Sequence, residues 1–189
     1  MQMRPEPIHD PADLEEIFAL RVAAWRARTD YFPEIERWAD SEDAKAVHWA
    51  VRDRGRIVAA ARLTIHDSLA YVPNAEIFRD VLPASLDGPI ASLNRLVVAA
   101  SHSGQGHSAS LDRVRIDHAR LEGCRHVIGE TYAGMKRIAQ LGDLGFKVAG
   151  TARPYGSGPL AAVKAARNLS VERADRVATI VHLRLAAAE

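Results

Sequence analysis

The chain has 189 residues, 48% of them hydrophobic, and its 25 basic side chains nearly balance 24 acidic ones, for a net charge of +1. This balance excludes an electrostatic basis for binding nucleic acid or an anionic membrane. No apolar run approaches the ~18 residues of a membrane span, and the single cysteine, Cys124, excludes an internal disulfide. The eight histidines are scattered without metal-ligand spacing. We expect one cytoplasmic domain over residues 1–189, with no metal site.

The N-terminal part predicts a short strand over Met3–Ile8 and then a helix. Asp10 is a good N-cap residue, and Pro11 stands where a missing N–H costs nothing. The apolar residues that follow at helical spacing are Leu14, Ile17, Phe18, Val22 and Trp25. Residues 28–45 are polar and irregular, and we expect at most one helical turn there, around Glu34–Trp38.

Two β-type runs come next, Ala46–Arg52 and Arg56–His66, and a short loop containing Gly55 joins them. This pattern predicts an antiparallel hairpin. A connector with a short helix over Ala75–Leu82 leads to Ala91–Ala99, which is apolar enough to be a central strand.

A turn rich in glycine, serine and histidine leads from that strand into a helix over Ser108–Glu122, with Leu111, Val114 and Leu121 on one face. The remaining predicted elements are a strand over His126–Thr131, a helix over Met135–Asp143, and strands over Phe146–Ala149 and Ala178–Leu185. Residues 150–176 have no clear pattern. The element order predicts a mixed α/β fold around one sheet, with a parallel pair formed by the strands at 91–99 and 126–131.

The segment from residue 96 to residue 108 carries the strongest functional signal. A buried strand runs into a turn with Gly104 and Gly106, and a helix begins directly after it. Backbone N–H groups of such a turn, together with the positive end of the helix dipole, form an anion site that needs no charged side chain. The turn lacks the Gly-Lys-Ser/Thr of a Walker A loop. Phosphate binding and an ordinary tight turn both remain open at this point.

The same turn resembles the hallmark of the GNAT superfamily of N-acyltransferases, a strand followed by Q/R-x-x-G-x-G/A and a helix. Gly106 matches the central glycine, while Ser103 and Ser108 stand at the two ends of the motif, where the family has Arg/Gln and Gly/Ala. Further matches in the family's order are the first helix after Asp10, the hairpin at 46–66, and the Leu144-Gly145-Phe146 sequence.

The resemblance implies a mostly antiparallel sheet flanked by helices, with the strands at 91–99 and 126–131 splayed around the pantetheine arm of a donor. The donor is acetyl-CoA or another acyl-CoA. The residues that would bind it are Leu96, Val97 and Val98 in the strand and Ser103, Gly104, Gln105, Gly106, His107 and Ser108 in the turn. A backbone N–H of Val97 or Val98 would hold the thioester carbonyl.

The catalytic residues follow from the chemistry of acyl transfer, which needs a neutral amine and a proton for the leaving thiolate. Many family members use a tyrosine in the helix before Leu-Gly-Phe as the acid, but Leu141 stands at that position. Tyr132 is the nearest alternative. We expect Glu130 to act as the base, with pairing to an arginine as the competing interpretation. His102 and His107, in a glycine turn, are expected to be solvated, and Cys124 is not expected to be a nucleophile.

Three arginines lie where their neighbours predict burial, namely Arg21, Arg62 and Arg95. A buried guanidinium needs a partner, and Asp40, Asp43 and Glu130 are the candidates. We expect a charged network that lines an acceptor pocket, with Arg95 among the catalytic residues. The alternative is that these arginines lie at sheet edges and reach water.

A second resemblance is to the branch of acyl-homoserine-lactone synthases and N-acyl amino acid synthases, which use acyl carrier protein or CoA. The residues that carry it, in chain order, are Leu20-Arg21, Trp25, Asp40, Asp43, Arg62 and Asn94-Arg95-Leu96-Val97-Val98. Ser92 replaces the glutamate that this branch typically has three residues before the arginine of the fourth strand.

The sequence therefore predicts an enzyme that transfers an acyl group from acyl-CoA to a small-molecule amine. Two alternatives stay open. One is an N-acyl amino acid or lactone-like synthase that uses acyl carrier protein, and the other is a non-catalytic domain that binds CoA as a sensor. A homodimer is also left open, and no nucleic acid or membrane partner is expected.

Overall fold

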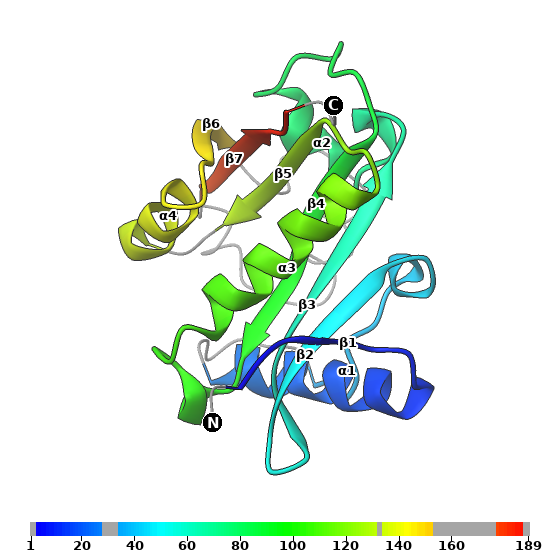
Figure 1. The fold of residues 1–189 in the computed structure, drawn as a ribbon, viewed down its shortest axis with the longest axis vertical. Coiled ribbons are helices and arrows are strands. Elements are labelled where there is room, and N and C mark those ends of the chain that lie inside the picture. Colours follow the sequence, from blue (N-terminus) through cyan, green and yellow to red (C-terminus); the bar gives the residue numbers. More distant parts are fainter. Residues whose placement is uncertain (1–2, 28–33, 132–133, 153–176, 187–189) are drawn as a thin grey trace. The chain divides into compact units, whose positions relative to one another are not determined.

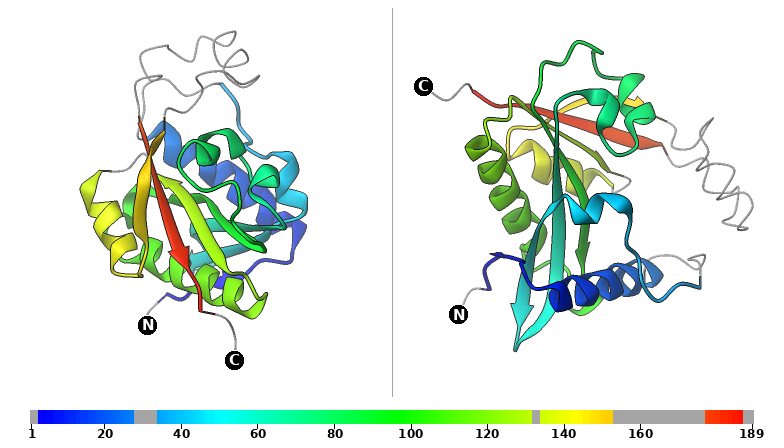
Figure 2. Two further views of the ribbon diagram at one scale, coloured as in Figure 1. Left: turned by 90° about the horizontal axis from the view of Figure 1, so that it is seen from above. Right: turned by 90° about the vertical axis from the view of Figure 1, so that its right-hand side faces the viewer.

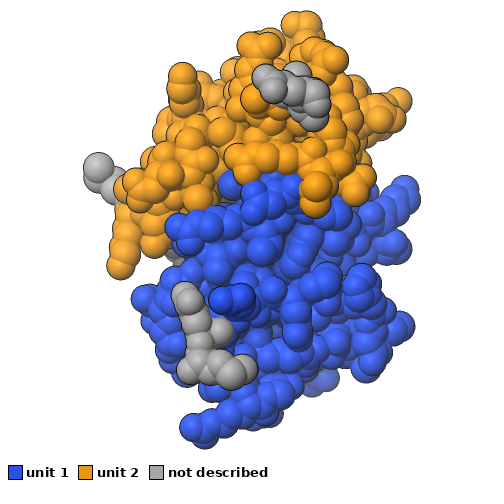
Figure 3. Space-filling view, in the orientation of Figure 1, with its two compact units in different colours: residues 1–64, 93–118 blue, residues 65–92, 119–189 orange. Residues whose placement is uncertain are grey.

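The computed structural model describes residues 3–27, 34–131, 134–152 and 177–186 (Figure 1). Seven strands form a mixed sheet in the order β1-β2-β3-β4-β5-β7-β6, with helices beside it, which confirms the predicted fold class. Unit 1 comprises residues 1–64 and 93–118, and unit 2 comprises residues 65–92 and 119–189 (Figure 3). A single domain over 1–189 and a splayed parallel strand pair stay predictions.

Unit 1 contains most of the elements that the glycine turn and the arginines belong to. Three of them cross the unit boundary, since the ends of β3, β4 and α3 extend beyond it. Its elements are β1 (Glu6–Pro7), α1 (Pro11–Arg26), the 3₁₀ helix η1 (Ser41–Ala44), β2 (Val47–Asp53), β3 (Arg56–His66), β4 (Ile90–Val98), the 3₁₀ helix η3 (Ala100–His102) and α3 (His107–Leu121).

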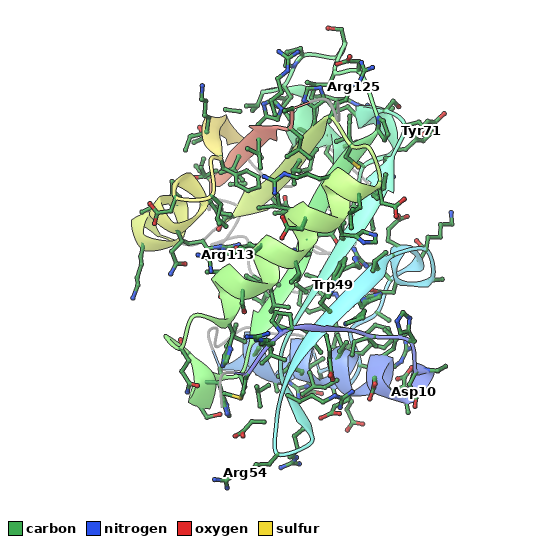
Figure 4. The ribbon with its side chains drawn as sticks, in the orientation of Figure 1. Asp10, Trp49, Arg54, Tyr71, Arg113 and Arg125 are labelled. Carbon is green, nitrogen blue, oxygen red and sulfur yellow. The ribbon has the colours of Figure 1, made fainter. Side chains whose placement is uncertain are left out.

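Helix α1 begins as predicted. The Asp10 side chain accepts a hydrogen bond from the Ala12 N–H at 2.8 Å, and Pro11 is the first helical residue. β2 and β3 form the predicted antiparallel hairpin. Its turn is tighter than expected, with φ values of +49° at Arg54 and +81° at Gly55, which is typical of a two-residue hairpin turn. Arg54 lies at the tip of the hairpin (Figure 4).

The strands of unit 1 lie between α1 and α3. Alternate residues of a strand face opposite sides of a sheet. Ala50 of β2 and Ala60 of β3 belong to the apolar cluster that contains Ile17 and Phe18 of α1. Trp49, the neighbour of Ala50, instead contacts His118 of α3, with 5.2 Å between ring centroids. The two helices therefore cover opposite faces (Figure 2).

Unit 2 has its own apolar core. Its elements are the 3₁₀ helix η2 (Leu69–Tyr71), α2 (Ala75–Arg79), β5 (His126–Thr131), α4 (Met135–Gly142), β6 (Lys147–Ala152) and β7 (Ala178–Arg184). β7 pairs antiparallel with both β5 and β6. Phe78 of α2 is 1% exposed and belongs to a cluster with Ile128 of β5 and Ile180 of β7. None of the helices in the described ranges is long and apolar enough to cross a membrane.

Three local predictions are wrong. The helical turn lies at Ser41–Ala44 instead of Glu34–Trp38, because Asp40 caps it in a capping box. Leu121, predicted on the buried face of α3, is 84% exposed in the last turn of the helix. The buried face carries Leu111, Asp112, Arg115, Ile116 and Ala119. The strand expected at Phe146–Ala149 starts at Lys147 and runs to Ala152.

Candidate active site

The glycine turn has the backbone that the sequence predicts. Gly104 and Gly106 have φ values of +80° and +84°, a region that favours glycine. Nothing lies within 4 Å of a Cβ built on either residue, so the turn is open on that side. The Gly106 carbonyl accepts from the Ser110 N–H at 3.1 Å and so begins α3. The first N–H groups of such a helix have no partner within the helix and can bind an anion.

The two histidines beside this turn are not simply solvated, so that expectation is wrong. His102 Nε2 lies 3.3 Å from Asp53 Oδ2, and His102 Nδ1 lies 2.9 Å from Ser101 Oγ. The contact between His102 and Asp53 links the end of β2 to η3. His107 is 5% exposed, and burial lowers the pKa of its imidazole, with the charge of His102 adding to the effect. Gln105 stays exposed, and its side chain amide is 3.5 Å from the Ser101 carbonyl.

The arginines predicted to be buried form an ion network in unit 1. Arg21 of α1 donates to both carboxylate oxygens of Asp43, at 3.0 and 2.9 Å. Arg62 of β3 donates to Asp43 at 2.8 Å and to Asp40 at 2.5 Å. Arg95 of β4 donates to Asp40 at 2.5 Å. The network therefore joins α1, η1, β3 and β4. We refer to these five residues as the arginine network.

Burial differs along the arginine network. The side chains of Arg21 and Arg62 are each 1% exposed, whereas those of Arg95 and Asp40 are 26% and 28% exposed. Full burial is thus confirmed for the first two arginines and is wrong for Arg95, which lies at the more open end. The arginine network has three guanidinium groups and two carboxylates. It carries one excess positive charge.

The carboxylates stay ionised in this setting. Burial acts to raise the pKa of Asp43, but hydrogen bonds from Arg21 and from the Asp40 N–H, with the charges of Arg21 and Arg62, hold that pKa well below its usual value. The pKa of Asp40 is lowered in the same way by Arg62 and Arg95, against burial. Burial lowers the pKa of neighbouring His48, so this imidazole adds no charge.

Arg95 has an unusual backbone. Its φ is +54°, in the left-handed region, although it lies within β4. A residue of this kind inside a strand is typical of a β-bulge. Its guanidinium stacks on the Trp38 ring at 4.3 Å, and Trp38 in turn meets the Trp25 ring edge-on at 5.7 Å. Arg95 is therefore held by a charge and by an aromatic face.

An open groove of about 420 Å³ lies beside the arginine network. Its lining includes the apolar side chains of Leu14 and Phe18 from α1 together with Asp40 and Asp43. The exposed pair of Arg37 and Glu15 also lines the groove. The groove can thus hold a small molecule with apolar and charged parts.

The other predicted site residues lie in β4, in β5 and outside the described part of the chain. Val97 and Val98 are buried in β4, at 2% and 6% exposure, and Leu96 is half-buried. Glu130 lies in unit 2, near the end of β5, and its carboxylate accepts from Asn74 Nδ2 at 2.8 Å. Tyr132 lies outside the described residues. The arginine pairing is confirmed for Asp40 and Asp43.

The sequence analysis missed a buried ion pair inside α3. Asp112 and Arg115 are 0% and 1% exposed, and Arg115 Nη2 donates to Asp112 Oδ1 at 2.5 Å. Their spacing of three residues, which brings side chains together on a helix, could have revealed the pair. Cys124 is buried, and burial raises the pKa of its thiol to about 11, which agrees with the expectation that it is no nucleophile.

Comparison with known proteins shows the family. The model of the acetyltransferase (GNAT) family matches residues 14–146, which is more than half of the chain. The chain therefore belongs to the GNAT acetyltransferase family and is an acyl-CoA-dependent N-acyltransferase. No curated protein matches its sequence significantly.

Several solved structures share the fold. FeeM, an N-acyl amino acid synthase from uncultured soil microbes, has 13% identity and a TM-score of 0.67 over 97% of this chain and 92% of its own. The acyl-homoserine-lactone synthase LasI has 14% identity and a TM-score of 0.64, covering 98% and 92%. A Bacillus subtilis acetyltransferase in complex with CoA has 11% identity and a TM-score of 0.60, covering 98% and 100%. At these identities the likeness shows the fold alone.

The arginine network should contribute strongly to stability. We expect Arg21→Met to lower the free energy of unfolding by roughly 3 kcal/mol, because a buried carboxylate loses one of its two guanidinium partners. Arg37→Met is the matched control, since the Arg37–Glu15 pair is exposed, and its urea midpoint should stay near that of the parent. Urea unfolding followed by circular dichroism measures both variants.

The pH dependence separates a charge effect from lost packing. The folded-state pKa of Asp43 is depressed, so its contribution is present above the unfolded pKa of about 3.9 and is lost as pH falls through the folded value. Without Arg21 this depression shrinks. The difference in stability between the parent and Arg21→Met should therefore narrow once pH falls below the folded pKa of Asp43 in the variant, which lies between the parent's folded value and about 3.9, so it should be smaller at pH 2 than at pH 5. A difference that stays constant over this range would contradict the electrostatic account.

Proposed function

We propose that the protein transfers an acyl group, in the first instance acetyl, from CoA to the amine of a small molecule. The observation that carries the donor half of this proposal is the turn between β4 and α3. It combines two glycines at positive φ, an open face and the start of a 15-residue helix. The family membership supports the same donor, and the B. subtilis relative was solved with CoA.

The turn from Ser103 to Ser108 would bind the pyrophosphate of CoA through backbone N–H groups. Ser103 lacks the long donor of the family motif, so the backbone has to supply most of the hydrogen bonds. In β4, a backbone N–H of Val97 or Val98 would hold the thioester oxygen as negative charge develops on it, with Leu96 beside the pantetheine arm.

Glu130 would remove a proton from the ammonium form of the acceptor, directly or through a water. The hydrogen bond from Asn74 orients its carboxylate without neutralising it. The free amine then attacks the thioester carbon, the nitrogen of the tetrahedral intermediate gives up its second proton to solvent as the intermediate collapses, and the CoA thiolate leaves and takes up a proton. Tyr132 is the proposed acid for that last step.

Donor binding should depend on the backbone of Gly106. We expect Gly106→Val to abolish the rise in melting temperature that CoA produces, because the side chain strains a φ of +84° and fills the open face toward the pyrophosphate. Thermal shift with CoA titration measures this effect.

Gly123→Val is the matched control. Gly123 follows α3, has a φ of +69° and has no atom within 4 Å of a built Cβ, so the backbone strain is similar. This variant should be destabilised but should keep its response to CoA. An unchanged CoA response in Gly106→Val would remove the basis for placing the donor at this turn.

Catalysis should depend on the basicity of Glu130. We expect Glu130→Gln to lower kcat by about 10²–10⁴-fold while leaving CoA affinity unchanged, since a general base typically contributes that much. The loss should shrink as pH rises from 6 to 9, because more of the acceptor is then already neutral. The measurement is CoA release with an amine found by screening.

Glu76→Gln, at an exposed position of α2, is the control and should behave like the parent. If Glu130→Gln is as active as the parent across this pH range, Glu130 has a structural role, and proximity and the oxyanion site must carry the reaction.

A second candidate function is an N-acyl amino acid synthase. The observation that favours it is the excess positive charge of the arginine network, whose more exposed end is Arg95. A free carboxylate of an α-amino acid would balance that charge. FeeM carries the name of this activity and has the highest TM-score of the three structures compared above. Acyl carrier protein would then replace CoA as the donor, as the sequence resemblance suggests.

Paired acceptors and donors test the second candidate. We expect amino acids to be used at least about tenfold better than their amides, since a charge-assisted pair is lost in the amide. Arg95→Gln should remove this preference by raising KM for the acids, and Arg54→Gln, at the exposed tip of the β2–β3 hairpin, should not. Equal use of acids and amides by the parent would reject the carboxylate site. Acyl-CoA and acyl carrier protein compared at equal concentration identify the donor.

A further inference from the structure

The buried pair of Asp112 and Arg115 contacts the backbone of the two strands that carry the arginine network. Arg115 Nη1 donates to the Arg62 carbonyl of β3 at 3.1 Å and to the Asn94 carbonyl of β4 at 3.4 Å. All these residues belong to unit 1. The pair approaches from the α3 side of the strands. The Arg62 side chain lies on the α1 side, where His48, its register partner in β2, contacts the Asp43 carbonyl.

Both carbonyls belong to residues that shape the arginine network. The Arg62 side chain lies between Asp40 and Asp43, and its Nε donates to the Asn94 side chain. Asn94 directly precedes Arg95, whose φ is +54°. A left-handed residue inside a strand is typical of a β-bulge, which locally disrupts the ladder of the strand. The Asn94 carbonyl, directly before this residue, is part-buried and accepts from Arg115.

We infer that the Asp112–Arg115 pair is a positioning device for acyl transfer, holding β4 in the distorted form that aims Arg95 and the amides of residues 96–98. Asp112 orients the planar guanidinium from one side, and the two strand carbonyls accept from the other side. Arg115 thus sets the spacing of β3 and β4 where the site lies. The inference rests on the proposed function, because the roles of Arg95 and of the β4 amides come from it.

Stability alone does not require this pair. A buried ion pair can often be replaced by apolar side chains of similar volume without loss of stability. Such a replacement would remove the donors to the Arg62 and Asn94 carbonyls while keeping the interior filled. A positioning role and a merely structural role therefore predict different results for the same variant.

The test is the double variant Asp112→Leu with Arg115→Met, compared with Arg113→Met. Arg113 is exposed on the same helix, and its side chain points away from the strands (Figure 4). With an amine acceptor, we expect kcat of the double variant to fall by about 10–100-fold, since a displacement of about 1 Å can cost that much. The response to CoA in thermal shift and the donor KM should stay within about twofold of the parent. The control should match the parent in all three.

Arg115→Lys decides the question if the double variant does not fold. Lysine keeps a charge beside Asp112 but has a single nitrogen, so it lacks the planar fork in which Nη2 holds Asp112 while Nη1 donates to the two carbonyls. We expect a loss in kcat of about tenfold, again with unchanged response to CoA. A kcat equal to that of Arg113→Met, in whichever of the two variants is folded, overturns the inference.

A readout without turnover separates this inference from the proposed function. If none of the amines tested makes the parent release CoA from acyl-CoA, the proposed function fails. The backbone amide NMR signals of Arg95 and Leu96 then become the test of the positioning role. These signals should shift in the folded variant and stay in place in Arg113→Met. Signals that coincide in both variants overturn the positioning role.

Discussion

The buried carboxylate of Asp43 is the constraint around which unit 1 is organised. It accepts from Arg21 of α1 and from Arg62 of β3, and it also accepts from the Asp40 N–H at 2.8 Å. Neither arginine could be buried alone, because an unpaired guanidinium in an apolar interior is strongly disfavoured. One acidic side chain therefore holds a helix, a capped turn and a strand in a single arrangement.

Exposure to solvent increases from one end of the arginine network to the other. Arg21 and Arg62 are out of contact with water, while Arg95 and Asp40 are partly accessible. With three guanidinium groups and two carboxylates, the positive excess is best accommodated at the open end, where water or a ligand can reach it. The aromatic face of Trp38 keeps the Arg95 guanidinium in place there. The recognition of an acceptor carboxylate that we propose for Arg95 would follow from this uneven distribution of charge and exposure.

The donor site that we propose at the glycine turn would rely on backbone groups instead of side chains. Gly104 and Gly106 supply positive φ at the start of α3, and Arg95 supplies it within β4. Only the first two are glycines, so the strain at Arg95 has to be offset by its contacts and by those of the preceding peptide. Asp112 and Arg115 are part of that compensation. The donor turn and the strand distortion are therefore linked through the N-terminal half of one helix.

The sequence by itself determined much of this protein, because the signals concerned are local. Asp10 and Pro11 mark the start of α1, two β-type runs at 46–52 and 56–66 flank a tight turn with Gly55, and Gly104 and Gly106 mark the path from β4 into α3. It also supplied the list of arginines and the aspartates that could pair with them. These features depend on helix capping, strand periodicity and glycine conformation, which act over a few residues.

Only the tertiary structure decided how the arginines share their partners and which of them stays accessible. Arg21, Asp43 and Arg62 are separated by about twenty residues at each step, so no local pattern reports their distances. The buried face of α3 was mispredicted for a related reason. Its two central positions are Asp112 and Arg115, and a search for apolar periodicity passes over charges that neutralise each other. Burial there is decided by pairing, and pairing becomes visible only when the strands and the helix are assembled.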